Sequence, residues 1–343
     1  MSSLSVLLKF LKGLLLSLSI IKEMSYFFSF LAIVLSSYFY IQIAEKFNIT
    51  DVPNERSSHR EITVRGLGIV FVIPVILFFV QSGFSYPFFM FGFILAAGIS
   101  IIDDIYTVSS KIRLFIQIAS VGFLLFELAV PNESFYYLTF LLILGVGIVN
   151  GFNFMDGING LTGLYSLISL LTLIYINQLV ILFIELDFLI LMVLGVLIFL
   201  FFNFRKKARG FSGDVGSVGI GLVLCFFIFQ LIFTTNDWRY IFLFFVYGLD
   251  TLVTIVIRLV RKENIFEAHR KHLYQLLANE RGVSHLNVSI SYGIAQILLN
   301  AWIISYREVV DFVFFIPFIL TFILTVLLRI RINRESLLPN NKI

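Results

Sequence analysis

Long apolar stretches alternate with short polar segments along almost the whole chain. Each stretch comes close to the roughly 20 mostly apolar residues that a helix needs to cross a bilayer. The sequence shows no alternation typical of a β-barrel, so we expect the spans to be helical. The eleven predicted spans are residues 24–44, 66–82, 86–102, 113–130, 135–150, 157–177, 181–203, 215–235, 239–258, 288–306 and 309–329.

Composition supports the same class of protein. Hydrophobic residues make up 59% of the 343 positions and charged residues 13%, with a mean hydropathy of +0.99. Soluble proteins carry about 25% charged residues, so this much apolar surface requires lipid. We therefore predict an all-α, polytopic integral membrane helical bundle of about 11 transmembrane helices. The single cysteine, Cys225, excludes an intrachain disulfide, and the net charge of +4 is no signature of nucleic-acid binding.

Positive charge is segregated between the two sets of loops. Twenty of the 25 Lys and Arg residues lie in one set, whereas only Arg239 and Arg307 lie in the other. The remaining three precede the first span. Because cytoplasmic loops carry the excess of Lys and Arg, we predict the inner cell membrane, with the N-terminus out and the C-terminus in. The longer polar loops, and the chemistry with them, then face the cytoplasm.

The first of these polar loops reads DVPNERSSHREITVRGLG over residues 51–68. Arg56, His59 and Arg65 offer N–H donors to a phosphate group. Glycines near its end let the backbone approach a ligand closely. An ordinary basic loop beside anionic lipid is the alternative interpretation.

The second loop begins with two adjacent carboxylates, Asp103 and Asp104, at the end of a span. Acidic side chains at a membrane boundary are costly and are usually functional. We expect the pair to bind a divalent cation, to accept a proton, or to do one of each. Lys111 and Arg113 follow closely and could hold a lipid phosphate. Solvated charge at a helix end is the alternative.

The third motif, NGFNFMDGINGL over residues 150–161, spaces Asn150, Asn153, Asp156 and Asn159 three apart. On a helix these four side chains would share one face. The interspersed glycines favour instead an irregular polar loop at the membrane boundary, where polar backbone is tolerated beside a cavity. Its oxygens could bind Mg²⁺ or read the edge of a base or sugar. A purely structural loop is the alternative.

The fourth motif, GFSGDVGSVG over residues 210–219, follows a basic run and opens a span. Free N–H groups at a helix N-terminus attract phosphate, and Asp214 there could hold Mg²⁺ against it. Phe211 is suited to stacking on a base, a contact that contributes about 1–3 kcal/mol. In a chain with 41 Phe residues, a lipid anchor is the alternative role for Phe211.

The fifth motif, IFEAHRKHLYQ over residues 265–275, places His269 and His272 about one helical turn apart, beside Arg270. No further Cys or His ligand is close in sequence, so a zinc site is disfavoured. A cluster that binds phosphate or sugar fits these residues better. A solvated basic helix is the alternative.

Together these five motifs, in this order, resemble those of the polyprenyl-phosphate N-acetylhexosamine-1-phosphate transferases, glycosyltransferase family 4. The resemblance covers roughly residues 45–290. The histidine motif is similar to that of the branch that initiates O-antigen or capsule repeats. The chain departs from the family where Ile62, Val64 and Leu67 replace two prolines and a glycine.

The resemblance implies transfer of HexNAc-1-phosphate from a UDP-HexNAc to polyprenyl (undecaprenyl) phosphate, with release of UMP. It implies Mg²⁺ as cofactor, with Mn²⁺ as the alternative. Either Asp103 or Asp104 would orient or deprotonate the lipid phosphate. The implied roles are catalytic for Asp103, Asp104 and Asp156; metal-binding for Asp214 and Asn153; nucleotide-binding for Phe211, Asn159 and Asn150; and phosphate- or sugar-binding for His269, Arg270, His272, Arg56, His59, Arg65, Lys111 and Arg113.

We divide the chain into three parts. Residues 1–23 form an N-terminal amphipathic or extension segment, residues 24–329 a single transmembrane catalytic domain, and residues 330–343 a basic cytoplasmic tail. Within the spans, Asp250 lies deep and is expected to pair with a neighbouring helix. The acidic residues expected to snorkel at outer span ends are Glu127, Glu185, Asp187 and Asp311.

Three alternatives stay open from the sequence. A direct displacement is favoured over a covalent aspartyl-phosphate. A multi-span transporter would suit apolar spans broken by polar loops, but it predicts inverted repeats and polar residues near span centres. A catalytically dead, lipid-binding relative is disfavoured by the intact aspartates. Partners beyond the UDP-sugar, the lipid phosphate and the bilayer are not indicated, and a homodimer stays open.

Overall fold

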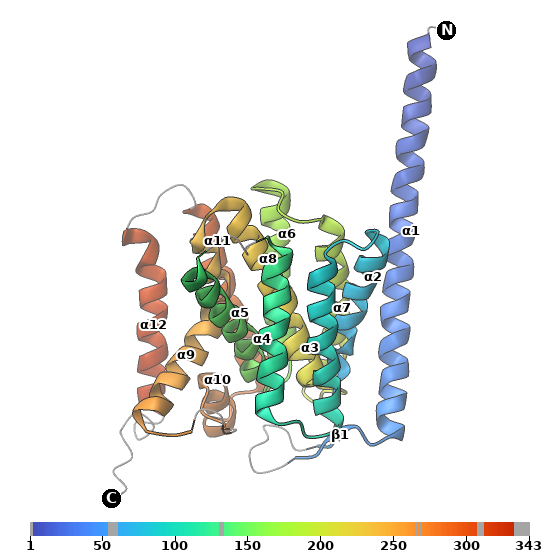
Figure 1. Ribbon diagram of the computed structural model, residues 1–343. Helices are drawn as coiled ribbons and strands as arrows, with labels where there is room; N and C mark the ends of the chain where they lie inside the picture. Colours follow the sequence, from blue (N-terminus) through green and yellow to red (C-terminus); the bar gives the residue numbers. More distant parts are fainter. Residues whose placement is uncertain are drawn as a thin grey trace, which may run out of the picture.

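The chain forms a bundle of helices with almost no strand (Figure 1). The computed structural model describes residues 3–53, 61–129, 134–264, 267, 269–306 and 312–332, with side chains from residue 22 onward. Its helices are α1 (Ser3–Lys46), α2 (Val72–Gln81), α3 (Pro87–Ile105), α4 (Ser110–Glu127), α5 (Phe135–Met155), α6 (Leu161–Leu179), α7 (Leu186–Asn203), α8 (Gly213–Thr235), α9 (Phe245–Val260), α10 (Leu273–Gln275), α11 (His285–Ser305) and α12 (Phe312–Ile332). The prediction of an all-α polytopic membrane protein is therefore confirmed.

Each of the eleven predicted spans coincides with a helix, and nine helices in the described part of the chain are long and apolar enough to cross a membrane. The other two predicted spans do not meet this criterion, for simple reasons. The segment Leu67–Gln81, made of the 3₁₀ turn η1 (Leu67–Phe71) and α2, is shorter. Helix α4 has only 18 residues, and they include the charged residues Lys111, Arg113 and Glu127.

Helix α1 is the longest element and extends past the other helices at one side of the bundle (Figure 1). It runs from Ser3 to Lys46 without a break. The boundary predicted at residue 23 therefore falls inside a continuous helix, so the N-terminal segment and the first span form one element.

Helix α8 lies at the centre of the bundle. It is apolar on all sides, and 94% of its most hydropathic stretch is buried, as expected of a helix surrounded by other helices. Small residues allow this close packing: a Cβ on Gly68 of η1 would lie only 2.0 Å from Cα of Gly216. The first turn of α8, which lies within the fourth motif, is thereby held in a fixed place.

The loops of the first and fourth motifs are bound to each other through backbone. Strands β1 (Thr50–Asp51) and β2 (Thr63–Val64) pair antiparallel. The N–H of Phe211 donates to the oxygen of Val64 at 2.8 Å, and the N–H of Leu67 donates to the oxygen of Phe211 at 2.8 Å. The departures from the family at Val64 and Leu67 thus leave these backbone contacts in place. We call the end of the bundle that carries β1, β2 and α10 the polar end (Figure 1).

Acidic side chains at the opposite end have partners on neighbouring helices. Glu127 accepts from the N–H groups of Phe88 and Phe89 at 2.6 and 3.0 Å, at the start of α3. Glu185 and Asp187 likewise accept from tyrosine hydroxyl groups. The snorkelling residues therefore also tie helices together; Asp311 lies outside the described residues.

Candidate active site

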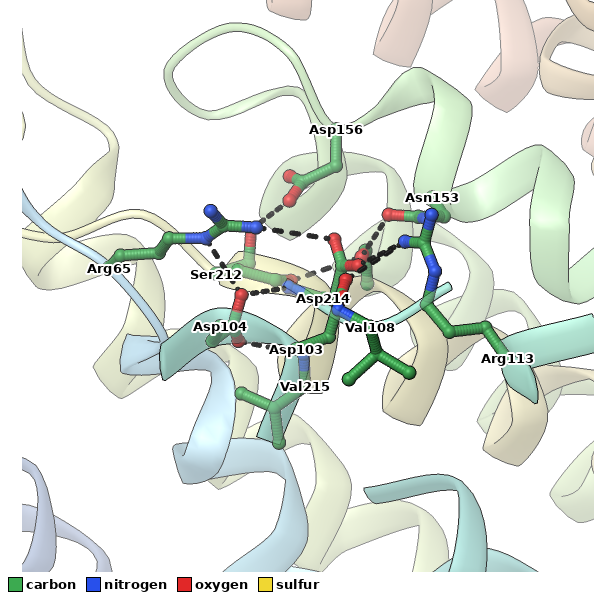
Figure 2. A network of polar contacts seen from close by, with 12 residues as sticks. Arg65, Asp103, Asp104, Val108, Arg113, Asn153, Asp156, Ser212, Asp214 and Val215 are labelled. Carbon is green, nitrogen blue, oxygen red and sulfur yellow. Dashed lines mark hydrogen bonds and ion pairs between the residues drawn. The ribbon is translucent and has the colours of Figure 1, made fainter. Parts of the chain in front are cut away.

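Four helix ends and one loop bring the predicted carboxylates together at the polar end: the ends of α3 and α5, the starts of α4 and α8, and the loop that carries Arg65. Figure 2 shows them around the start of α8, in contact with two arginines. We call this group the carboxylate network. It consists of Asp103, Asp104, Asp156, Asp214, Arg65 and Arg113.

Asp104 is the anchor of the carboxylate network. Its side chain is 2% exposed, and it accepts from the backbone N–H groups of Asp214 at 2.9 Å and Val215 at 3.1 Å. It also accepts from Nε of Arg65 at 2.8 Å. A carboxylate at these N–H groups satisfies donors that the first turn of a helix leaves unpaired. Asp104 therefore fixes where α8 begins.

Gly213 is required at this contact. Its φ of +67° is unfavourable for residues with a Cβ, and a Cβ there would lie 2.4 Å from Oδ2 of Asp104. The glycine in the sequence SGD thus lets the buried carboxylate reach the backbone of α8.

The two arginines each bridge two carboxylates. Nη1 of Arg113 lies 2.9 Å from Oδ2 of Asp103 and 2.8 Å from Oδ2 of Asp214. Arg65, bound to Asp104, lies 3.8 Å from Oδ1 of Asp214 through Nη2. Burial acts to lower the pKa of Arg65, but Asp104 and Asp214 outweigh it and hold that pKa above its usual value. Arg65 therefore stays charged, and the side chains of both arginines remain about one-third exposed.

The third motif contributes Asn153 and Asp156. Oδ1 of Asn153 accepts from the hydroxyl of Ser217 at 2.8 Å, and Asp156 accepts from the hydroxyl of Ser212. Burial raises the pKa of Asp156 to about 6 and nearby Asp104 adds to it, although the hydrogen bond from Ser212 acts in the opposite direction. This carboxyl therefore titrates close to neutral pH.

The prediction of an irregular loop starting at residue 150 is wrong. Helix α5 continues to Met155, so Asn150 and Asn153 are helical and only the following residues form a loop. Gly151 is tolerated in the helix because it is buried beside Thr251 of α9. Burial within the bundle here outweighs the low helix propensity of glycine.

A pocket of about 310 Å³ opens beside the carboxylate network. Six residues predicted for the site line it: Arg65, Asn153, Asp156, Asn159, Phe211 and Asp214. Asp103 and Asp104 do not line the pocket themselves, but they help to position residues that do. The pocket thus joins acidic side chains to an aromatic ring and to amide groups, as a ligand with both charged and ring parts would require.

Eight further lining residues were not predicted as site residues: Asp51, Gly157, Ile158, Asn203, Ser212, Gly213, Gln275 and His285. Asp51 and Gln275 belong to the first and fifth motifs, but nothing in their spacing distinguishes them. Nδ1 of His285 accepts from the N–H of Asn159 at 3.4 Å, which joins α11 to the third motif. Only the tertiary fold brings these positions together.

Several predicted residues lie elsewhere. The amide of Asn150 donates to Gln117 at 2.8 Å, and neither the exposed Lys111 nor the exposed Arg270 lines the pocket. Arg56 and His59 lie outside the described residues.

Neither residue of the histidine pair lines the pocket. His272 is 2% exposed and its Nδ1 lies 3.6 Å from Oδ1 of Asp250. His269 stacks on it, with ring centroids 5.0 Å apart. Burial and the positive charges nearby lower the pKa of His269 to about 3, so its ring is neutral at pH 7.

The oxygen donors at the pocket fit a divalent cation that shares its ligands with a phosphate. No group of three or more His, Cys, Asp or Glu suited to a metal occurs in the described part of the chain. Mg²⁺, however, commonly takes one or two protein carboxylates and completes its shell with phosphate and water. Asp214 and Asn153 both line the pocket. The four carboxylates of the network also exceed its two guanidinium groups by two charges when all are ionised.

Residues 86–232 match the sequence model of Glycosyl transferase family 4. No curated protein matches the chain. The matched region runs from α3 through most of α8 and contains the second, third and fourth motifs, so the resemblance to this family is confirmed.

Proposed function

We propose that this member of glycosyl transferase family 4 moves HexNAc-1-phosphate from a UDP-HexNAc to polyprenyl phosphate and releases UMP. The family match supports a polyprenyl-phosphate sugar-1-phosphate transferase. We also propose three details: that the sugar is a HexNAc, that the lipid is undecaprenyl phosphate, and that the reaction starts an O-antigen or capsule repeat. They rest on the motifs.

The observation that carries this proposal is that charged and nucleotide-recognising side chains line the same pocket. Asp214 and Arg65 line it together with Phe211 and Asn159. Phosphoryl transfer depends on positioning and on charges around the phosphate oxygens, and nucleotides commonly stack on aromatic rings. A sugar nucleotide placed with its base at Phe211 would carry its diphosphate towards the carboxylate network.

The proposed step is one direct displacement. An oxygen of the lipid phosphate forms a bond to the sugar-linked phosphorus, and the bond from that phosphorus to the UMP oxygen breaks, so UMP leaves with the electron pair. In the structure Asp103, Asp104 and Asp214 each accept from an arginine. A carboxylate so held is a poorer nucleophile than a free one, which favours this route over an aspartyl-phosphate. A trapped, labelled phospho-enzyme would contradict it.

We assign Asp214 and Asn153 as ligands of Mg²⁺, or alternatively of Mn²⁺. A bound divalent ion would neutralise charge on the diphosphate. Asp103 and Arg113 would orient Asp214, and Asp104 would hold the helix that carries it. The guanidinium groups of Arg65 and Arg113 would face the phosphate oxygens.

Asp156 is the group best placed to accept a proton. It lines the pocket, and its pKa of about 6 leaves it mostly ionised at pH 7. The second ionisation of a phosphate monoester has a pKa of about 6, so most of the lipid phosphate needs no base. Asp156 would therefore accept the proton from the fraction of the lipid phosphate that is still protonated.

We propose that the polar end faces the cytoplasm in the inner membrane. The loops rich in Lys and Arg meet at this end. A transporter is less well supported, because its site is expected near mid-membrane between repeats, whereas the pocket is lined by residues at or next to helix ends.

The decisive experiment is UMP release by purified protein in detergent, with polyprenyl phosphate, Mg²⁺ and a panel of UDP-N-acetylhexosamines. Release that requires both the lipid phosphate and the metal would support the transferase and identify the sugar. No release with any donor, from protein shown to be folded, would contradict the proposed function.

A further inference from the structure

A buried ion pair joins two spans outside the pocket. Asp250 of α9 and Arg329 of α12 each have side chains 2% exposed, and Nη2 of Arg329 bonds to Oδ1 of Asp250. Burying two charges costs free energy unless further hydrogen bonds satisfy them. Hydrophobic residues at the same positions often stabilise a protein at least as much as a buried ion pair. The pair therefore calls for a role beyond joining α9 to α12.

Arg329 reaches the fifth motif directly. Besides Asp250, it donates to Oγ1 of Thr254 at 2.6 Å and, through Nη1, to the backbone oxygen of Lys271 at 3.1 Å. One side chain on the last span thus binds both α9 and the segment before α10.

Asp250 binds the next residues of the same segment. Its carboxylate accepts from the N–H groups of Leu273 at 2.8 Å and Tyr274 at 3.3 Å, the first residues of α10. The hydroxyl of Tyr292 on α11 donates to it at 2.7 Å. With Arg329, these contacts hold the start of α10 from three spans at once.

Helix α10 in turn forms part of the pocket wall. The hydroxyl of Tyr274 donates to the backbone oxygen of Phe154 at 3.0 Å. Its ring lies so close to Gly157 that a Cβ there would be 2.2 Å from the hydroxyl oxygen. Gly157 and Gln275 both line the pocket. A shift of α10 would therefore move the wall beside Asp156.

We propose that Arg329 is a positioning residue for the donor site: acting through Asp250, it holds Tyr274 and Gln275 of α10 against the loop of the third motif, and so shapes the pocket wall that receives the UDP-sugar. The contacts form a continuous path from the last span to the pocket. This proposal rests on the proposed function for its substrate, and on geometry alone for the path.

The first test separates the two substrates kinetically. Displacing a binding group by about 1 Å can cost up to about a hundredfold, so we expect Arg329→Met to raise the KM for the UDP-sugar by about ten- to a hundredfold. The KM for polyprenyl phosphate should change little. Arg329→Lys, which restores a positive charge without the planar fork, should recover part of the loss.

A matched control lies at the opposite end of the same part of the bundle. Arg239 pairs with Asp237 at 2.7 Å and donates to the backbone oxygen of Tyr306 at 2.9 Å, between α11 and α12. Arg239→Met removes a similarly paired arginine far from the pocket. It should leave both KM values as in the wild type.

A second readout does not depend on catalysis. Hydrogen exchange followed by mass spectrometry should show faster exchange at Leu273 and Tyr274 in Arg329→Met, because their N–H groups bind Asp250. Exchange should be unchanged at Val108, whose N–H donates to Oδ1 of Asp103 at 2.7 Å in the carboxylate network. If Arg329→Met does not fold, Tyr292→Phe removes one donor to Asp250 and should give the same pattern more weakly. If the wild type shows no transfer, the proposed function fails while this measurement still tests the path.

Two results would overturn the proposal. One is a folded Arg329→Met protein with unchanged donor KM and unchanged exchange at α10. The other is an equal rise in both KM values with faster exchange throughout the protein, which would indicate a merely structural pair.

Discussion

The four aspartates of the carboxylate network have the same type of side chain but different surroundings. Asp104 is nearly inaccessible and binds two backbone N–H groups of α8, whereas Asp214 is 16% exposed and lines the pocket. All four were predicted from the sequence as functional. Their division of labour was not, because the adjacent Asp103 and Asp104 point in different directions on a helix: Asp103 binds Arg113, 10 residues further on, whereas Asp104 binds the backbone N–H of Asp214, 110 residues away along the chain.

The first prediction concerns Asp214. Asp214→Asn keeps the shape but removes the charge that we assign to metal binding, so turnover should fall by at least about a hundredfold. The measurement is UMP release over a range of Mg²⁺ concentrations. Asp187→Asn, at the opposite end and paired with Lys22, is the matched control and should keep its activity. Unchanged turnover in Asp214→Asn would contradict the metal role.

The second prediction concerns pH. Because the pKa of Asp156 is raised to about 6, its carboxyl is protonated below pH 6 and ionised above it. If the ionised form accepts the proton, kcat/KM should fall about tenfold for each pH unit below 6. Asp156→Asn should lose this acidic limb. A limb set by the lipid phosphate would persist in both proteins, and identical profiles would exclude Asp156 as the base.

At the scale of elements, the positions of helices follow from apolar length, but the ends of helices depend on packing. Helix α5 continues through Gly151 to Met155, because this stretch of the helix is buried in the bundle, as Gly151 itself is. The histidine motif was expected at the ligand because His269 and His272 are polar and about one turn apart. It lies instead against Asp250. The sequence predicts that Asp250 pairs with a neighbouring helix, but it does not identify the partner, Arg329. Sequence spacing gives a shared face and not the identity of what that face contacts.

The third prediction tests the start of α8. Gly213→Ala places a Cβ at a φ of +67° and 2.4 Å from Oδ2 of Asp104. We expect a loss of about 1–3 kcal/mol in the free energy of unfolding, together with a fall in activity, because Asp214 is the next residue.

Gly219→Ala is the control within the same helix. A Cβ there meets only ring atoms of Phe93 at 3.8 and 3.9 Å, which is ordinary contact. Alanine also favours the helix by up to about 1 kcal/mol relative to glycine. Thermal unfolding and UMP release of the two variants check the prediction, and equal behaviour would mean that the approach of Asp104 to α8 is not critical.

At the scale of the molecule, the segregation of charge gives a prediction that local motifs cannot give. The polar end collects the loops with most of the Lys and Arg residues, and the acidic residues of the opposite end are used to tie helices together. Sequence alone predicts this sidedness because the positive-inside rule counts charges over whole loops. It was insufficient for the pocket, whose wall combines residues as distant as Asp51 and His285.

Cysteine labelling tests the sidedness directly. The only cysteine, Cys225, is fully buried, so the wild type should not react with a membrane-impermeant maleimide. Leu182→Cys lies in the exposed loop between α6 and α7, and Lys206→Cys lies in the exposed loop between α7 and α8. With the N-terminus outside, intact cells should label the cysteine at 182, and the cysteine at 206 should react only after the membrane is opened. The reverse pattern would place the carboxylate network outside the cytoplasm, where a UDP-sugar donor is not supplied, and would exclude the proposed reaction in the cell even if the purified protein released UMP.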